Sequence, residues 1–255
     1  MQRQRIRFTA SKAPAAVAAL AALTAAYGQA DIRRAEVVVA LGGDGFMLQT
    51  LHAAHGQRLP VYGMNCGTIG FLMNAYALED LPARLAAAEE TSINPLSMRA
   101  ETTRGKVTEA LAINEVSLLR ETRQTAKLEV SLNDRVVMAE LVCDGVLVST
   151  PAGSTAYNLS AQGPILPLGS GLLALTPISP FRPRRWRGAI LPETASVSIR
   201  VLDAVKRPVS AVADQREVRD VRKIDVAIDR AAALTFMFDP EHALDDRITM
   251  EQFVV

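Results

Sequence analysis

The stretch from Glu36 to Gly45 reads Glu-Val-Val-Val-Ala-Leu-Gly-Gly-Asp-Gly. Its first six residues are short, apolar and rich in β-branched side chains, which predicts a buried strand. The glycines that follow let the backbone approach a ligand closely, and a helix beginning after them would present unpaired N–H groups to an anion. The stretch therefore predicts a phosphate-binding strand–turn–helix unit. A tight turn with Asp44 as a helix cap is an equally good interpretation of these residues alone.

Strands and helices alternate on both sides of this stretch. We expect strands at Ile6 to Ala10 and Leu59 to Gly63. We expect a first helix that Ser11 caps, that has Pro14 in its first turn and that ends at Gly28. Two more helices are expected from Phe46 to His55 and from Leu78 to Glu90. Such alternation predicts a parallel sheet covered by helices. Arg3, Arg5 and Arg7 before an alanine-rich run also imitate a signal peptide, but alanine forms helices well and is a weak apolar core for a signal sequence, so we favour strand and helix.

The character of the sequence changes near Asn94-Pro95, after which short strands dominate as far as about Met237. Asn133-Asp134 reads as a hairpin turn, Ser154 to Ala161 as a helix and Glu241 to Gln252 as a closing helix. Many short strands predict an antiparallel sandwich or a related β domain. The expected strands are Ala110 to Leu119, Lys127 to Leu132, Val136 to Val142, Val146 to Thr150, Ala195 to Val201, Pro208 to Ala213, Lys223 to Ile228 and Ala233 to Phe238.

The composition is that of a globular protein without a polyanionic partner. The chain has 255 residues, 49% of them apolar, which is ample for a packed core. A net charge of +1 gives no argument for binding nucleic acid or a membrane. Cys66 and Cys143 form neither a disulfide framework nor a zinc pattern, so we expect a reducing, cytoplasmic compartment.

A second polar segment runs from Asp144 to Tyr157, where a strand ends in Pro-x-Gly and hydroxyl residues follow. Ser154 or Thr155 is expected to cap the next helix, and the same hydroxyls and amides suit a polar ligand. The ring and hydroxyl of Tyr157 suit a base and a hydrogen bond. The pair Asn114-Glu115 is a third candidate, because an amide can recognise a purine edge and a carboxylate a pair of ribose hydroxyls. An exposed strand end explains that pair equally well.

These three segments, in this order and approximate spacing, resemble the signatures of the NAD kinase family. The loop Asn65 to Leu72 and the residues Asn158-Leu159-Ser160 and Gly163-Pro164 extend the resemblance, which covers roughly Val37 to Phe238. The family likeness implies a Rossmann-like α/β domain at 1–95, a C-terminal β-sandwich domain at 96–237 and a tail at 238–255 that returns to the first domain. It places the active site in the cleft between the domains.

The resemblance also implies residue roles. Asp44 would be the base for the 2′-hydroxyl of the adenosine ribose of NAD, and Gly42, Gly43 and Gly45 would let phosphates approach. Asn114 and Glu115 would bind the adenosine part. The other expected nucleotide contacts are Asp144, Ala152, Thr155, Ala156, Tyr157, Asn158, Leu159, Ser160 and Gln215.

The activity implied is transfer of a phosphoryl group from ATP, or another donor, to NAD, with a divalent cation such as Mg²⁺ bridging the donor phosphates. The family likeness further implies a dimer or tetramer. Phe46, where many relatives have threonine, and Gln162, where a small residue is frequent, depart from the family pattern. The tetrapeptide Gly42 to Gly45 also occurs in diacylglycerol-type lipid kinases, and an NAD-binding sensor without turnover would retain Asn114 and Glu115. The long run from Asp144 favours the nucleotide kinase.

Overall fold

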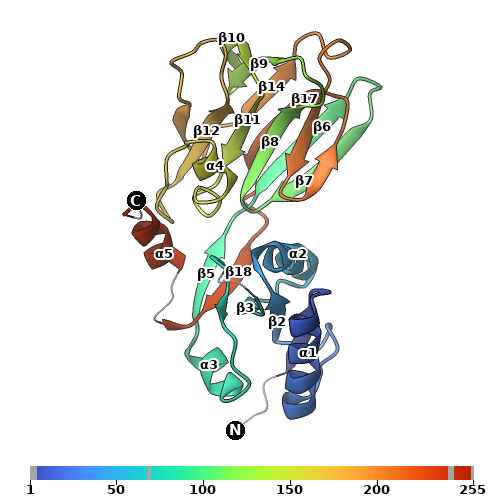
Figure 1. Cartoon of the computed structure of the whole chain (residues 1–255), viewed down its shortest axis with the longest axis vertical. Coiled ribbons are helices and arrows are strands. Elements are labelled where there is room, and N and C mark those ends of the chain that lie inside the picture. The colour runs from blue at the N-terminus through green and yellow to red at the C-terminus, as the bar shows by residue number, and fades with distance from the viewer. Residues whose placement is uncertain (1–4, 68–69, 241–243, 254–255) are drawn as a thin grey trace. The chain divides into compact units, whose positions relative to one another are not determined.

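The computed structural model describes residues 5–67, 70–240 and 244–253. The chain forms two compact units (Figure 1). The first comprises Met1–Asn94 with Ala231–Arg247, and the second comprises Pro95–Arg230 with Ile248–Val255. The chain therefore crosses from one unit to the other at Asn94-Pro95, where the composition changes, again at Arg230-Ala231, and a third time at Arg247-Ile248.

The first unit is built on a largely parallel sheet. Its strands run in the order β1-β2-β3-β18-β5. Strand β18 pairs with the first residues of β3, and β4 pairs with the last two, Met64 and Asn65. All of these pairs are parallel except that of β18 with β5. The strands are β1 (Ile6–Ala10), β2 (Val37–Gly42), β3 (Val61–Asn65), β4 (Asn74–Ala75), β5 (Glu89–Ile93) and β18 (Leu234–Phe238).

The described helical segments of this unit are α1 (Pro14–Tyr27), α2 (Asp44–Ala54), the 3₁₀ turn η1 (His55–Gln57) and α3 (Leu81–Ala87). Helix α5 (Leu244–Glu251) begins in this unit, and its residues from Ile248 belong to the second. Helix α1 ends at Gly28, whose φ of 81° favours glycine, as expected. The prediction that Ser11 caps it was wrong, because Ala13 occupies the N-cap position and makes no side-chain cap. Proline in the first turn compensates, since its fixed φ suits a helix start.

Two expected elements of the first unit differ from the structure. The helix predicted from Leu78 to Glu90 is shorter, because Asp80 adopts a left-handed φ of 54° immediately before α3. Glu89 and Glu90 belong to strand β5, which pairs with β18. Strand β18 itself, expected in the second domain, completes the first sheet. The pairing of β5 with β18 determines where the helical segment ends and which sheet β18 joins. The local periodicity of the sequence does not reveal such pairing between distant segments.

The second unit contains two antiparallel six-stranded sheets in the orders β10-β9-β14-β17-β6-β7 and β13-β12-β11-β8-β15-β16. The first consists of β6 (Leu96–Thr102), β7 (Val107–Ala112), β9 (Ala126–Leu132), β10 (Arg135–Cys143), β14 (Val197–Val201) and β17 (Val221–Ile228). The second consists of β8 (Glu115–Arg120), β11 (Gly145–Ser149), β12 (Leu172–Ile178), β13 (Ala189–Pro192), β15 (Val209–Ala213) and β16 (Arg216–Val218).

One apolar core joins the inner faces of these two sheets. Leu96 and Met98 of β6 share it with Val116 and Leu118 of β8. Alternate residues of β6 and β9 are buried, as a sheet with one inward face requires. The β-sandwich predicted from the sequence is confirmed. Asn133 and Asp134 both have positive φ, 48° and 64°, in the expected hairpin turn between β9 and β10.

No helix among the described residues is long and apolar enough to cross a membrane.

Candidate functional site

The glycine-rich turn lies where β2 gives way to α2 in the first unit. Gly42 ends the strand, Gly43 occupies the N-cap and Asp44 is the first helical residue. A Cβ on Gly42 would stand 2.9 Å from Cβ of Phe46, so that position has no room for a side chain. Phe46 therefore packs its ring against the turn. The expected strand–turn–helix unit is present, and the helix begins two residues earlier than the sequence suggested.

The carboxylate of Asp44 is fixed by a loop that follows β3. Oδ2 accepts the backbone N–H of Phe71 at 2.7 Å, and Oδ1 accepts that of Leu72 at 2.8 Å. The loop comes so close that a Cβ on Gly70 would stand 2.5 Å from Oδ1. Each carboxylate oxygen still has capacity for a further hydrogen bond, and Asp44 is only partly buried. Its side chain is thus held in place with capacity for a further hydrogen bond.

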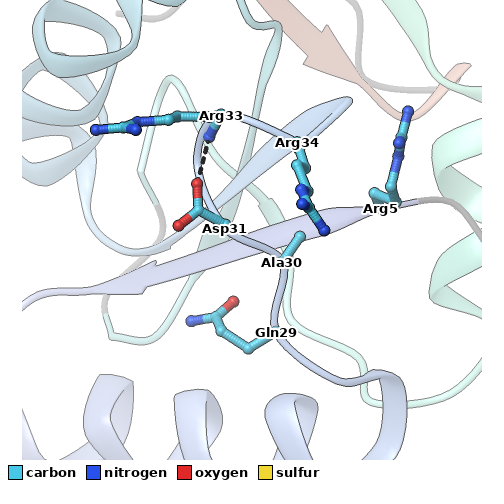
Figure 2. A pocket seen from close by; sticks show the side chains of 6 residues that line it. All are labelled: Arg5, Gln29, Ala30, Asp31, Arg33 and Arg34. Carbon is cyan, nitrogen blue, oxygen red and sulfur yellow. Dashed lines mark hydrogen bonds between the residues drawn. The ribbon is translucent and has the colours of Figure 1, made fainter.

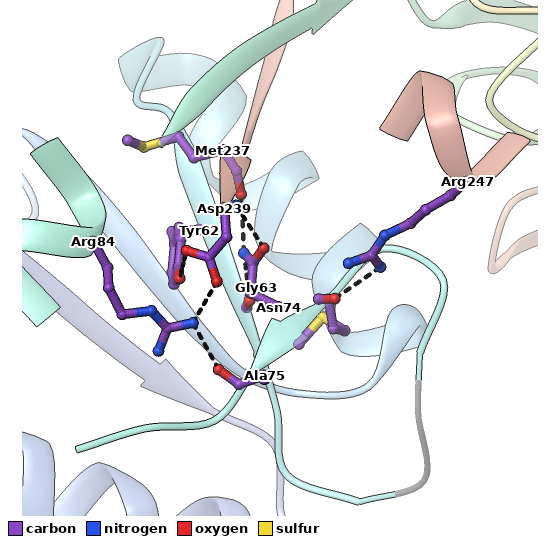
Figure 3. Close-up of polar contacts among 9 residues, drawn as sticks. Tyr62, Gly63, Asn74, Ala75, Arg84, Met237, Asp239 and Arg247 are labelled. Atoms are coloured by element: carbon purple, nitrogen blue, oxygen red, sulfur yellow. Dashed lines mark hydrogen bonds and ion pairs between the residues drawn. The ribbon is translucent and has the colours of Figure 1, made fainter. Parts of the chain in front are cut away.

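The same loop is also bound by Arg247 of α5, which Figure 3 shows reaching toward it. Nη1 of Arg247 donates to the carbonyls of Phe71 at 2.8 Å and Met73 at 2.9 Å, with a longer contact of 3.4 Å to Gly70. The guanidinium also lies over the ring of Phe238, 5.5 Å from its centroid. Burial lowers the pKa of Arg247, while the negative charges of Asp44 and Asp239 act in the opposite direction.

A polar network anchors the end of this loop to the sheet (Figure 3). The amide of Asn74 donates to the carbonyls of Gly63 and Met237 and accepts the backbone N–H of Asp239. Asp239 accepts hydrogen bonds from the Tyr62 hydroxyl at 2.6 Å and from Arg84 at 2.5 Å. Burial, followed by the hydrogen bond to Asp239, raises the pKa of Tyr62. The network ties β3, β4, α3 and the end of β18 together.

In the second unit, Asn114 lies in the break between β7 and β8, and Glu115 is the first residue of β8. We expected one strand from Ala110 to Leu119, but the carboxylate of Asp214 accepts the backbone N–H groups of Ile113 at 2.7 Å and Asn114 at 2.9 Å. These two amides are therefore bonded to a side chain instead of to a neighbouring strand. The chain changes from one sheet of the sandwich to the other at this point.

Both candidate side chains at this break have an unsatisfied buried atom. Among the described residues, Oδ1 of Asn114 and Oε2 of Glu115 are buried without a hydrogen-bond partner. Burial raises the pKa of Glu115 to about 7, the charge of Asp214 adds to the rise, and a backbone hydrogen bond from Tyr157 opposes it. Because an unsatisfied buried polar atom costs about 1–3 kcal/mol, two adjacent ones indicate a site completed by a ligand.

The turn from Thr150 to Tyr157 packs directly on this break. Thr150 Oγ1 donates to the carbonyl of Ile113 at 2.7 Å and accepts the N–H of Gly153 at 3.0 Å. A Cβ on Gly153 would stand 2.2 Å from the carbonyl oxygen of Asn114. Two of the signature segments, at 114–115 and 150–157, therefore meet here, and Asp214 joins them from a third part of the chain.

The helix expected from Ser154 to Ala161 reduces to α4 (Tyr157–Ser160). Ser154 does not cap it, because its Oγ donates to the carbonyl of Pro151 at 2.6 Å and accepts the N–H of Leu166 at 3.0 Å. Thr155 does not cap it either, since Ala156 is the N-cap residue. Turns stabilised by side chains replace the first half of the expected helix.

Asn158 was expected to contact the nucleotide, but its side chain is fully buried and bonded within the protein. Its Nδ2 donates to the carbonyls of Ser154 and Pro164, and its Oδ1 accepts the hydroxyl of Thr176 at 2.6 Å. A Cβ on Gly163 would stand 2.1 Å from that Oδ1. The amide of Asn158 therefore organises the 154–164 segment.

The remaining candidates differ in accessibility. Asp144 forms an ion pair with Nε of Arg120 at 2.5 Å, with about a third of each side chain exposed. Ala152 is buried and Gln215 is exposed. Partly buried positions are Thr155, Ala156, Tyr157 and Leu159, and Ser160 is exposed. Gln162, which departs from the family pattern, has a φ of 63°, a conformation that suits a small residue or glycine better.

Sequence reasoning missed two residues that shape these sites. Asp214 stands beside the expected Gln215 in the turn between β15 and β16, and the preference of aspartate for turns was the available signal. Arg247 gave no signal, because its partners are backbone carbonyls far away in the sequence.

Two pockets of the first unit have no part in the expected sites. One, of about 640 Å³, is lined by Arg5, Arg33, Arg34 and Asp31 with Gln29 and Ala30 (Figure 2). The other, of about 430 Å³, lies along β1 and α2 and includes Phe46. Asp44 lines neither. No group of three or more His, Cys, Asp or Glu side chains among the described residues could hold a metal ion.

Comparison with known protein families matches nearly the whole chain. Residues 2–93 match the ATP-NAD kinase N-terminal domain, and residues 113–236 match the ATP-NAD kinase C-terminal domain. An NAD kinase of Rhizorhabdus wittichii is 65% identical over the full length of both chains. An NAD kinase of Caulobacter vibrioides is 55% identical over 98% of this chain and 96% of its own.

Solved structures share the fold. Yeast NADH kinase complexed with NADH has a TM-score of 0.85 at 20% identity, covering 98% of this chain and 87% of its own. An NAD kinase from Archaeoglobus fulgidus in complex with ATP has a TM-score of 0.75 at 22% identity, covering 97% and 98%. Both likenesses extend over the two units of the chain.

Proposed function

Because this chain belongs to the NAD kinase family and phosphorylates the 2′-hydroxyl of the adenosine ribose of NAD, we propose that Asp44 is the general base of that transfer. The 2′-oxygen attacks the terminal phosphorus of the donor, the bond to the bridging oxygen breaks, and the hydroxyl proton passes to Asp44. The observation that supports this role is a partly buried carboxylate, fixed by two backbone N–H groups at a strand–helix turn. Alignment supplies most of the acceleration in phosphoryl transfer, so a fixed base suits it.

Asn114 and Glu115 bind the adenosine part of NAD in this proposal. Oδ1 of Asn114 and Oε2 of Glu115 are buried without a hydrogen-bond donor. The hydroxyl groups of a ribose or the amino group of a base could donate to them. With a pKa of about 7, Glu115 binds equally as acceptor or donor near neutral pH. Asp144, Ala152, Gln215 and the Thr155 to Ser160 segment complete the pocket in this proposal, and the Asn158 amide supports it through its hydrogen bonds within the protein.

ATP is the proposed donor, supported by the ATP complex of the Archaeoglobus relative. Gly42, Gly43 and Gly45 allow phosphates to approach the first turn of α2, whose amide dipoles favour an anion. The described residues contain no group of three or more His, Cys, Asp or Glu side chains that could hold a metal ion. The glycine-rich turn from Gly42 to Gly45 supplies one carboxylate, that of Asp44. Mg²⁺ is commonly held by one or two carboxylates together with substrate phosphates. We assign it no step of the mechanism.

The same placement predicts selectivity between substrate and product. A 2′-phosphate would occupy the position of the incoming phosphoryl group and face the Asp44 carboxylate. NADP should bind as a product and should not be phosphorylated.

We also propose a cytoplasmic homo-oligomer. Cys66 and Cys143 are free thiols, which is consistent with a reducing compartment. Light scattering during gel filtration would measure the molar mass and so the number of subunits.

The test is a coupled assay of NADP formation from NAD and Mg-ATP with wild type and Asp44→Asn. We expect kcat to fall at least about a hundredfold, with KM for NAD nearly unchanged, because a general base acts in the transition state. Asp31→Asn, which removes an exposed carboxylate of the same unit, is the matched control and should retain wild-type kcat. Full turnover by Asp44→Asn would remove Asp44 from the chemistry. NAD binding without turnover by wild type would indicate a sensor instead of a kinase.

A further inference from the structure

Two consecutive peptide groups connect Asp44 to Arg247 in the first unit. The group between Gly70 and Phe71 donates its N–H to Oδ2 of Asp44 at 2.7 Å and offers its carbonyl to Arg247 at 3.4 Å. The next group, between Phe71 and Leu72, donates to Oδ1 at 2.8 Å and accepts from Arg247 at 2.8 Å. The carboxylate and the guanidinium thus bind opposite ends of the same two peptide dipoles.

This arrangement is electrostatically consistent at every contact. A cation at a carbonyl oxygen polarises the peptide, which makes its N–H a stronger donor to an anion, and chained hydrogen bonds strengthen one another. Hydrogen bonds to charged groups are stronger than those between neutral groups. The attraction between Asp44 and Arg247 is also felt directly, because the Asp44 charge acts on the titration of Arg247.

Between Gly70 and Met73, which the structure describes, the loop belongs to no strand. Its nearest sheet pairing begins at Asn74, where two-residue β4 joins β3. Arg247 binds a third carbonyl there, that of Met73 at 2.9 Å, and so connects the bridging peptides to the anchored end of the loop. Stacking on Phe238 fixes the guanidinium plane in turn. A loop that must present two N–H groups to one carboxylate therefore depends on this arginine.

We propose that Arg247 of the C-terminal helix is a positioning residue for the reaction, which fixes Asp44 through the Gly70–Phe71 and Phe71–Leu72 peptide groups. This inference rests on the proposed role of Asp44 as base. Arg247 touches neither Asp44 nor any reacting atom in this scheme. Its effect on turnover must therefore pass through the Asp44 carboxylate, and a double-mutant cycle can detect that dependence.

The experiment measures kcat for wild type, Arg247→Met, Asp44→Asn and the double variant. We expect Arg247→Met to lose about tenfold in kcat alone but less than about twofold in the Asp44→Asn background, because residues that act as a unit are non-additive. Arg247→Lys should recover part of the loss, since an ammonium also donates three hydrogen bonds. Arg5→Met is the control: it removes an exposed arginine of this unit, bonded to Glu36 and outside the network around the loop, and should leave kcat unchanged.

The outcomes separate the inference from the proposal beneath it. An unchanged kcat in Arg247→Met, or the same tenfold factor in both backgrounds, overturns the positioning role while leaving Asp44 as base. A wild-type kcat in Asp44→Asn overturns the base assignment first. If Arg247→Met does not fold, Arg247→Lys carries the same cycle, and a loss of kcat of equal factor in both backgrounds contradicts the inference.

Discussion

The backbone N–H of Asn114 donates to the carboxylate of Asp214 at 2.9 Å, across a separation of 100 residues in the sequence. With the neighbouring bond to Ile113, this contact ends β7, begins the β8 segment and aims the Asn114 and Glu115 side chains. The geometry of the candidate nucleotide site therefore depends on Asp214, whose carboxylate accepts these two N–H groups and whose own N–H donates to the carbonyl of Glu115.

Replacing Asp214 with asparagine should raise KM for NAD by about tenfold with a smaller change in kcat. An asparagine side chain offers one carbonyl oxygen, so one of the two N–H groups would face an NH₂ group and lose its acceptor. Steady-state kinetics measures the change. Asp203→Asn is the control, because Asp203 is also an aspartate with a positive φ, is exposed and lies outside the site, so KM should stay within twofold.

Gly70→Ala should lower kcat by about tenfold or more. The new Cβ would stand 2.5 Å from Oδ1 of Asp44, so the carboxylate must leave its two N–H donors or the loop must move. Gly67→Ala in the same loop is the matched control, because a Cβ there has open space within 4 Å. Equal kcat values for the two variants would show that the close approach at Gly70 does not matter for turnover.

Thr176→Val should destabilise the second unit by about 1–3 kcal/mol, because it keeps the shape of the side chain but leaves the buried Oδ1 of Asn158 without a donor. Urea denaturation measures the change in the free energy of unfolding. Thr235→Val removes a hydroxyl from the exposed pair with Ser92 and should change stability by less than about 0.5 kcal/mol. A loss of similar size in both variants would contradict the structural role given to Asn158.

Glu115→Gln should change how stability depends on pH. The pKa of Glu115 rises from 4.5 to about 7 on folding, so the folded chain binds more protons than the unfolded chain between these values. Stability from this group is complete below about pH 4.5 and is lost as the pH rises toward 7. The variant lacks this loss, so its Tm should decline less than that of wild type between pH 5 and pH 7.5, which differential scanning fluorimetry at about half-unit steps can follow. Parallel Tm curves would contradict the raised pKa.

Local patterns predicted the elements that carry their own signals. The β-branched run before Gly42 forms β2. Asn133 and Asp134 form the predicted hairpin turn, because asparagine and aspartate tolerate the positive φ that the turn requires. The motif residues identified both candidate sites, because glycine and hydroxyl residues have chemical requirements visible in the sequence. The Asp44 turn in particular was found from four residues.

Elements determined by distant partners could not be predicted in this way. Glu89 and Glu90 continue a helical pattern, yet they form β5 because β18 arrives from the other end of the chain. The single strand expected at Ala110 to Leu119 breaks because of Asp214, and the helix expected at Ser154 shortens because Leu166 and Pro151 engage its hydroxyl. In each case a tertiary hydrogen bond outweighed a local preference worth less than about 1 kcal/mol per residue.

The position of β18 has a consequence for biosynthesis. Ribosomes release the chain from its N-terminus, and domains generally fold in that order. Here β5 pairs with β18, and β18 pairs with β3, so the sheet that carries Asp44 lacks a central strand until residue 238 has left the ribosome. The entire sandwich, from Pro95 to Arg230, is synthesised in the meantime. The second unit can therefore complete its core first, and a nascent chain stalled before Leu234 would present an unfinished sheet edge at β3.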